Sequence, residues 1–155
     1  DAVLSVPYIA VRDDFDVLCT LHRPVNTDNP STLLQIVGFL IRVAKEKRIL
    51  LLLHPRTRKC LLENGLLENL SKCVLISPPV GYIETINYLR NSSLLITDSG
   101  GMQKEAFYAG KNSLVLRDET EWVELVDGGY SWLLINSMAL SKSSGVSIPM
   151  GGTHA

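Results

Sequence analysis

The sequence contains no long hydrophobic run, no large excess of charge of one sign and no close pair of cysteines. No apolar stretch approaches the roughly 18–20 residues of a membrane-spanning helix, and the N-terminus lacks the pattern of a signal peptide. The formal net charge is −1, so the chain as a whole attracts neither nucleic acid nor an anionic membrane. We therefore predict a cytoplasmic protein in which any bound anion is held by a local site.

The cysteines Cys19, Cys60 and Cys73 are odd in number and far apart. They form no zinc-binding pattern, so we predict reduced thiols in apolar surroundings and no metal site. The 155 residues, 46% hydrophobic and 20% charged, suffice for one globular domain with a sizeable core. The first residue is Asp1 rather than Met, which indicates a processed protein or a piece of a longer one.

Short apolar runs alternate with helix-compatible segments from residue 16 to residue 136. Runs that are apolar throughout indicate strands buried on both faces. Such strands, joined by helical crossovers, form a parallel, doubly wound sheet, so we predict a Rossmann-like α/β fold with about six strands. The predicted strands are residues 17–21, 49–53, 73–76, 94–97, 113–116 and 132–135. Residues 1–15 are interpreted as a connecting segment, and residues 137–155 as an irregular C-terminal tail.

Two helix boundaries can be predicted from capping residues. Asn29 supplies an N-cap and Pro30 suits the first helical position, so a helix is predicted from there to residue 47. Its apolar face consists of Leu33, Leu34, Val37, Leu40, Ile41 and Ala44. A second helix is predicted over residues 57–64, ending at Gly65.

The most informative segment lies at residues 96–106, where an apolar run ends in polar residues and two glycines before a helix-compatible stretch. A strand, a tight turn and a helix N-terminus form a phosphate site, because free backbone N–H groups and the helix dipole favour an anion. Gly100 and Gly101 would let a phosphate approach the backbone closely, and Glu105 lies where a carboxylate can reach a ribose hydroxyl. The segment therefore favours nucleotide or nucleotide-sugar binding.

This segment matches neither common nucleotide fingerprint. It is not G-x-G-x-x-G, which excludes the dinucleotide motif, and it is not G-x-x-x-x-G-K-[ST], which disfavours a P-loop ATPase. The alternative interpretation is an ordinary strand-to-helix turn capped by Asp98 or Ser99, with Glu105 solvated.

Two histidine-containing motifs follow the first two predicted strands, at the edge of a parallel sheet where ligands bind. His22 and Arg23 would neutralise a phosphate or a leaving group there. The alternative is that His22 forms its hydrogen bonds with backbone groups and that Arg23 is an ordinary surface arginine. His54 and Arg56 are candidate contacts for a substrate or an effector, and the alternative is a loop with Arg56 solvated at a helix start.

Together, these motifs resemble the non-hydrolysing UDP-N-acetylglucosamine 2-epimerase family. The matching segments are Thr-Leu-His-Arg-Pro-Val-Asn at 20–26, His-Pro-Arg-Thr at 54–57, Pro-Pro-Val-Gly-Tyr at 78–82, Thr-Asp-Ser-Gly-Gly-Met-Gln-Lys-Glu-Ala at 97–106 and Leu-Arg-Asp-Glu-Thr-Glu at 116–121. They occur in the family's order. The family fold is two Rossmann-like domains facing each other, as in GT-B glycosyltransferases, and this chain resembles the C-terminal, UDP-binding half.

The resemblance implies a binding role for several motif residues. The diphosphate is expected over Ser99, Gly100 and Gly101, the ribose hydroxyls at Glu105, and the uracil beside the segment around Tyr82. Arg23 belongs to the same implied UDP-binding set. His22 is expected beside the diphosphate, where family members use it in catalysis.

The implied reaction inverts C2 of the sugar and interconverts UDP-GlcNAc and UDP-ManNAc, through elimination of UDP and its re-addition. It needs no metal or redox cofactor, and it belongs to the biosynthesis of cell-envelope polysaccharides. The implied partners are a UDP-sugar, the N-terminal domain of the same enzyme and a second copy in a homodimer. Because the family's catalytic carboxylates lie in that N-terminal domain, we expect the chain alone to be inactive.

One departure leaves the sugar open. The family often has Thr-Glu-Arg-Pro where this sequence has Thr-Glu-Trp-Val at residues 120–123, so an expected arginine contact to the diphosphate is absent. The variant form is more similar to relatives acting on modified sugars, including UDP-diacetamido-glucuronic acid. Two alternative functions remain: the donor-binding domain of a GT-B glycosyltransferase, and a non-catalytic UDP-sugar-binding module.

Overall fold

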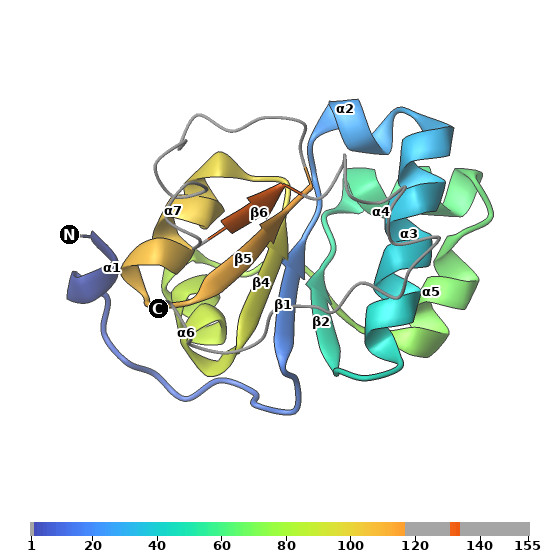
Figure 1. Ribbon diagram of the computed structural model, residues 1–155. Coiled ribbons are helices and arrows are strands. Elements are labelled where there is room, and N and C mark those ends of the chain that lie inside the picture. Colours follow the sequence, from blue (N-terminus) through green and yellow to red (C-terminus); the bar gives the residue numbers. More distant parts are fainter. Residues whose placement is uncertain (1, 117–130, 134–155) are drawn as a thin grey trace.

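The computed structural model describes residues 2–116 and 131–133, and its core is a parallel β-sheet (Figure 1). The strand order is β3-β2-β1-β4-β5-β6, and every pairing is parallel. The strands are β1 (Val17–Thr20), β2 (Ile49–Leu52), β3 (Leu75–Ser77), β4 (Leu94–Thr97), β5 (Asn112–Val115) and β6 (Ser131–Leu133). The prediction of a parallel α/β sheet is confirmed. The predicted tail and the 116–121 motif, apart from its first residue, lie outside the described residues.

Helices cover both faces of the sheet (Figure 1). They are α1 (Ala2–Ser5), α2 (Pro24–Thr27), α3 (Pro30–Ala44), α4 (Pro55–Glu63), α5 (Leu67–Cys73), α6 (Tyr82–Asn91) and α7 (Gly100–Tyr108). Val17 and Cys19 of β1 pack with α3 and α5 in one core cluster, whereas Leu18 packs with α6 and α7 in a second. This alternation explains why the strands are apolar throughout, since both faces of each strand are buried. None of the described helices is long and apolar enough to cross a membrane.

The helix predicted after β1 is present, but its buried face differs from the prediction. The Asn29 side chain accepts hydrogen bonds from the backbone N–H groups of Ser31 and Thr32 at 3.0 and 3.2 Å, as an N-cap should. Leu34 is 57% exposed, so its assignment to the buried face was wrong. The buried side chains of α3 are Leu33, Ile36, Val37, Phe39, Leu40 and Val43.

The segment between β2 and β3 contains two helices where one was predicted. Gly65 adopts a φ of +69°, a left-handed conformation that turns the chain after α4. The chain then enters α5, which ends at Cys73, and β3 begins only at Leu75. The prediction of a strand starting at Cys73 was therefore wrong. Cys73 is also exposed rather than in apolar surroundings, whereas Cys19 is buried and its burial raises the pKa of the thiol.

The N-terminal segment, interpreted from sequence as a connection, packs along α6. Asn87 of α6 accepts a hydrogen bond from the Ile9 N–H at 3.1 Å. Arg90 donates to the carbonyl oxygens of Val3 and Val6, both at 2.9 Å. The side chains of Val3 and Val6 are buried in the same core cluster as α6. The N-terminal segment is therefore held against α6 by hydrogen bonds between its backbone and the side chains of Asn87 and Arg90.

Arg90→Ala should lower the free energy of unfolding by about 1–3 kcal/mol, because three carbonyl groups lose a charged donor. Urea denaturation of the purified chain measures this change. Arg58→Ala, on the exposed surface of α4, is the matched control and should change stability by less than about 0.5 kcal/mol. Equal stability of the two variants would contradict a fastening role for Arg90.

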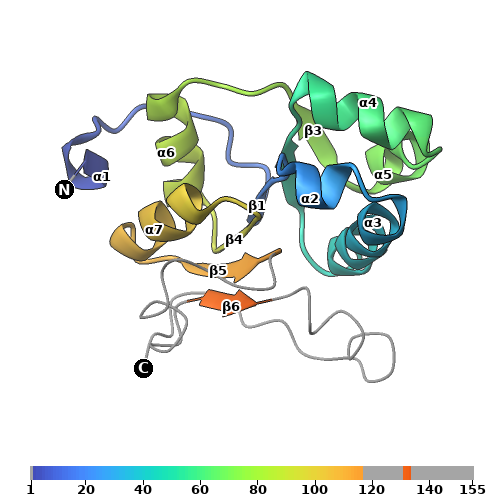
Figure 2. The same cartoon turned by 90° about the horizontal axis from the view of Figure 1, so that it is seen from above.

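The sheet order places a topological switch point between β1 and β4. From β1 the chain proceeds outward to β2 and β3, then returns to the other side of β1 to form β4 and β5. Thr20 and Thr97 end these two central strands in register, and their hydroxyl oxygens lie 2.6 Å apart. In doubly wound sheets ligands bind beyond the carboxyl ends of the strands at this point. Figure 2 views the molecule from above that edge.

Candidate functional site

The helix N-terminus predicted to hold phosphate is formed as expected at the end of β4. Ser99 is the N-cap of α7, and its hydroxyl oxygen accepts a hydrogen bond from the Met102 N–H at 3.2 Å. Gly100 and Gly101 are the first residues of the helix, so their N–H groups have no carbonyl acceptor within it. These two N–H groups and the positive end of the helix dipole can therefore receive an anion.

Gly101 is not required by the geometry of the free protein. Its φ is negative, since the positive-φ glycines are Gly65 and Gly110. A Cβ at position 101 would meet only the Ser99 hydroxyl oxygen, at an ordinary contact distance of 3.7 Å. The lack of a side chain at Gly101 therefore leaves space beside the first turn of α7 for a bound ligand.

Asp98 is a buried carboxylate at the switch point, and it binds the loop after β1. It accepts hydrogen bonds from the backbone N–H groups of His22, at 3.1 Å, and Arg23, at 2.8 Å. The Asn26 side-chain amide donates to it at 3.1 Å and to the Leu116 carbonyl at 3.0 Å. Asp98 does not cap α7, which is the role of Ser99. It instead joins the ends of β1 and β4.

The His22 imidazole forms an ion pair with the same carboxylate. Its Nδ1 lies 3.3 Å from Asp98 Oδ1, and its side chain is 53% exposed. The hydrogen bond to Asp98 raises the pKa of His22, against partial burial and the charge of Arg23. Burial would raise the pKa of Asp98, but the hydrogen bonds from His22, Arg23 and Asn26 outweigh it and hold that pKa below its usual range.

His54 and Arg56 have structural partners at the start of α4. The Nδ1 of His54 accepts a hydrogen bond from the Arg56 N–H at 3.1 Å, which makes His54 the N-cap of the helix. The Arg56 guanidinium pairs with Asp28 at 2.9 Å and also donates to the His22 carbonyl at 3.4 Å. Arg56 is exposed at the start of α4, as the alternative expects, and its side chain also connects α4 to the end of α2.

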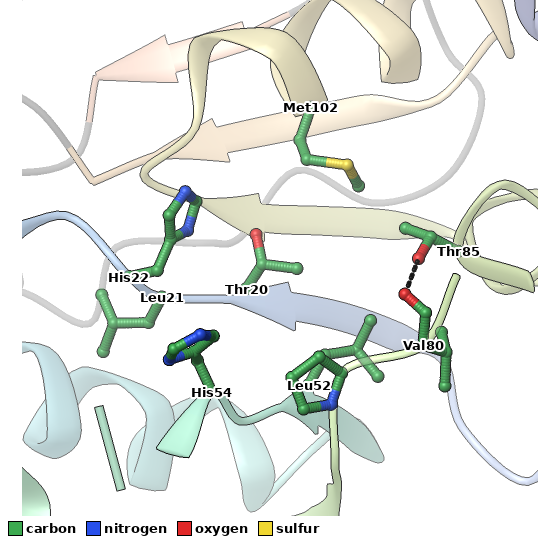
Figure 3. Close-up of a pocket in the computed structure, with 9 residues that line it drawn as sticks. Thr20, Leu21, His22, Leu52, His54, Val80, Thr85 and Met102 are labelled. Atoms are coloured by element: carbon green, nitrogen blue, oxygen red, sulfur yellow. Dashed lines mark hydrogen bonds between the residues drawn. The ribbon is translucent and has the colours of Figure 1, made fainter. Parts of the chain in front are cut away.

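A pocket of about 210 Å³ opens between these elements (Figure 3). His22 and His54 face each other across it from the ends of β1 and β2, and Met102 of α7 lies on a further side. The other walls are largely apolar. The lining residues are Thr20, Leu21, His22, Leu52, His54, Pro79, Val80, Thr85 and Met102. An apolar pocket with a few convergent polar groups is typical of a small-molecule site.

Tyr82 and Glu105, predicted for uracil and ribose, are brought together from α6 and α7. The Tyr82 hydroxyl hydrogen-bonds the Glu105 carboxylate, and this interaction raises the pKa of Tyr82 to about 12. Tyr82 is nevertheless 47% exposed, so its ring is accessible to a ligand. Neither side chain lines the pocket described above, and their interaction connects α6 to α7.

The structure brings two further residues, Asp98 and Asn26, to the candidate site. Asp98 was considered only as a helix cap, although a carboxylate directly after a central strand is itself a signal for the switch point. Asn26 carried no signal in spacing or composition. Its position depends on how the ends of β1, β4 and β5 meet, through its contacts with Asp98 and Leu116.

Comparisons with known proteins place these motifs in context. The family model described as UDP-N-acetylglucosamine 2-epimerase matches residues 5–141. A UDP-2,3-diacetamido-2,3-dideoxy-D-glucuronate 2-epimerase from Pseudomonas aeruginosa is 48% identical over 131 residues, which cover 81% of this chain and 34% of that protein. The chain thus spans about a third of that relative's length.

Solved structures show the same similarity. The UDP-GlcNAc 2-epimerase from Methanocaldococcus jannaschii superposes with a TM-score of 0.77 at 32% identity, over 97% of this chain and 44% of the other. The same enzyme in complex with UDP-GlcNAc and UDP gives a TM-score of 0.72 at 34% identity, over 90% and 41% of the two chains.

Proposed function

The chain belongs to the UDP-N-acetylglucosamine 2-epimerase family, and from that membership we propose that it forms the UDP-binding half of a UDP-sugar 2-epimerase. One observation carries the proposal: the switch point places the open first turn of α7 beside the His22–Asp98 pair. A dipole, free N–H groups and an imidazole that favours its charged form then converge on one anion. This is the arrangement that a departing diphosphate requires.

In the proposed reaction, the bond between C1 of the sugar and the UDP oxygen breaks, and the electron pair stays on the diphosphate. The proton on C2 is lost in the same elimination and returns to the opposite face before UDP adds again. The residues of this chain bind and stabilise UDP while it is separate. Gly100 and Gly101 provide N–H donors, Arg23 and His22 provide positive charge, and Glu105 holds the ribose.

The sugar is proposed to be an N-acetylhexosamine with further substituents. The Pseudomonas relative, whose name specifies a diacetamido-glucuronate, is 48% identical, against 38% for the Methanocaldococcus UDP-N-acetylglucosamine 2-epimerase. Both UDP-GlcNAc and UDP-2,3-diacetamido-glucuronate should therefore be assayed. We also propose that the complete enzyme has an N-terminal domain that faces this one, and that two copies of the enzyme form a dimer.

Calorimetric titration with UDP tests the binding half directly. We expect a dissociation constant in the high-micromolar range or weaker, or about −5 kcal/mol, because the facing domain does not contribute. The chain alone should not exchange the C2 proton of UDP-GlcNAc with deuterated water. Exchange should require the facing half of the enzyme, and turnover by the isolated chain would contradict this division of roles.

Glu105→Gln should weaken UDP binding about tenfold, because a neutral amide is a poorer acceptor for two ribose hydroxyls than a carboxylate. Tyr82→Phe is the matched control, because it removes the hydroxyl that pairs with Glu105 and leaves the carboxylate in place. Its effect on UDP affinity should be smaller. If Glu105→Gln binds UDP as well as the unaltered chain does, the ribose assignment is wrong.

A further inference from the structure

Asp98 is a buried carboxylate that accepts hydrogen bonds from several groups. In the described part of the chain, none of its partners is an arginine or lysine side chain. It is fully buried and receives two backbone N–H groups, the Asn26 amide and the His22 imidazole. A buried carboxylate with several donors stays ionised. Among the described residues, its only cationic side-chain partner is His22, so the protonation of that imidazole is coupled to a fixed negative charge.

The contact also determines which nitrogen of His22 carries the proton. Because Nδ1 lies 3.3 Å from an acceptor-only carboxylate, Nδ1 must be the protonated nitrogen of the neutral ring. Nε2 is then left for a ligand in the pocket that His22 lines. The Thr20 and Thr97 hydroxyls hydrogen-bond each other, and Thr97 directly precedes Asp98.

We propose that Asp98 is a positioning residue that fixes the tautomer of His22 and favours its protonated form, so that the diphosphate of a UDP-sugar meets a positive charge beside the first turn of α7. This inference rests on the UDP site proposed above. Asp98 does not touch the nucleotide. It acts through His22, whose Nε2–H donates to a diphosphate oxygen.

The other charged groups around His22 do not reproduce this effect. Arg23 lies on the same loop, and its charge lowers the pKa of His22. Arg56 of α4 donates to the His22 carbonyl but pairs with Asp28, and His54 faces His22 across the pocket. Among the described residues, Asp98 is therefore the only carboxylate in contact with the imidazole.

The first test is an NMR titration of the His22 imidazole in the whole chain. The inference requires His22 to titrate above the ordinary value of about 6.5, with Nδ1 protonated in the neutral ring. Asp98→Asn should lower that pKa, because the hydrogen bond and the negative charge that favour the imidazolium are removed. It should also reverse the tautomer, because an amide nitrogen facing Nδ1 cannot accept its proton. The same replacement in the serine-protease triad presents the wrong tautomer without moving the ring.

The second test is the pH dependence of UDP-GlcNAc binding, since its diphosphate diester does not titrate near neutrality. Affinity for the unaltered chain should fall several-fold as the pH rises through the pKa of His22, which lies above its ordinary value of about 6.5. In Asp98→Asn the fall should occur at lower pH, and in His22→Asn it should disappear. Asp14→Asn removes a carboxylate from an exposed pair with Arg12, and it should leave the profile unchanged.

The outcomes separate this inference from the proposed function. A pKa of His22 at or below its ordinary value in the unaltered chain would overturn the role of Asp98. That measurement uses the unaltered chain, so it does not depend on whether a variant folds. An unchanged pH profile in Asp98→Asn would overturn it too. If His22 and Asp98→Asn titrate as expected but UDP-GlcNAc does not bind at any pH, the coupling stands and the UDP site is wrong.

Discussion

Gly101→Ala should reduce the affinity of the chain for UDP at least tenfold while leaving the fold intact or slightly more stable. The new Cβ meets only the Ser99 hydroxyl oxygen at 3.7 Å, and the backbone φ is acceptable for alanine. Replacing a glycine by alanine within a helix stabilises it by up to about 1 kcal/mol. The methyl group would, however, occupy the space through which the diphosphate approaches the N–H groups.

Calorimetry with UDP and urea denaturation measure the two effects separately. Gly38→Ala is the matched control, because this glycine lies in α3, where a Cβ would approach only the Arg42 guanidinium at 3.9 Å. It should gain stability without loss of UDP affinity. Gly101→Val should extend the series to a loss of more than about 100-fold. If Gly101→Ala binds UDP normally, the diphosphate does not lie over this turn.

Much of the fold follows from short-range signals that this sequence displays clearly. Asn29 and Pro30 predict the start of α3 because capping depends only on neighbouring residues. The apolar runs of β1, β2 and β4 predict buried parallel strands because no polar face is present. The order of the strands was not predicted, since it depends on which edges pair in three dimensions.

The errors in the fold arise where two local signals compete. Leu34 has helical spacing with buried residues of α3, but the buried face is rotated toward Ile36, Phe39 and Val43, which leaves Leu34 exposed. Gly65 ends α4 as predicted, yet the residues after it form α5 rather than leading to a strand. A left-handed glycine stops one helix without excluding another.

The candidate site was only partly predictable for a related reason. Ser99, Gly100 and Gly101 lie within one strand–turn–helix unit, so their geometry follows from adjacent residues. Asp98 and Asn26 act across 72 positions of sequence, and their contact exists only once β1, β4 and β5 are assembled. The binding of a ligand by Gly100, Gly101 and His22 stays a prediction.

Asn26→Leu should be the most destabilising single change at the site, with a loss of about 2–5 kcal/mol at neutral pH. The leucine keeps the branched shape but removes a buried amide that donates to Asp98 at 3.1 Å and to the Leu116 carbonyl at 3.0 Å. Removing one partner of a buried, hydrogen-bonded charge costs far more than removing a surface hydrogen bond. Urea denaturation at neutral pH measures the loss.

The pH dependence of that loss identifies its cause. The pKa of Asp98 is lowered in the folded chain, mainly because hydrogen bonds outweigh burial, so its ionised form stabilises the fold above the ordinary carboxyl range. This contribution disappears as the pH falls through the folded pKa, below about 4. The difference between the variant and the unaltered chain should therefore shrink in acid, because a protonated Asp98 no longer needs the amide donor.

Asn64→Leu provides the matched comparison for this experiment. Asn64 also donates its side-chain amide to a carbonyl, that of Cys60 at 2.8 Å, but it is exposed and contacts no carboxylate. Its loss should cost less than about 1 kcal/mol at every pH. A pH-independent loss in Asn26→Leu would mean that the asparagine supports the Leu116 carbonyl alone. The buried charge at the switch point would then not depend on it.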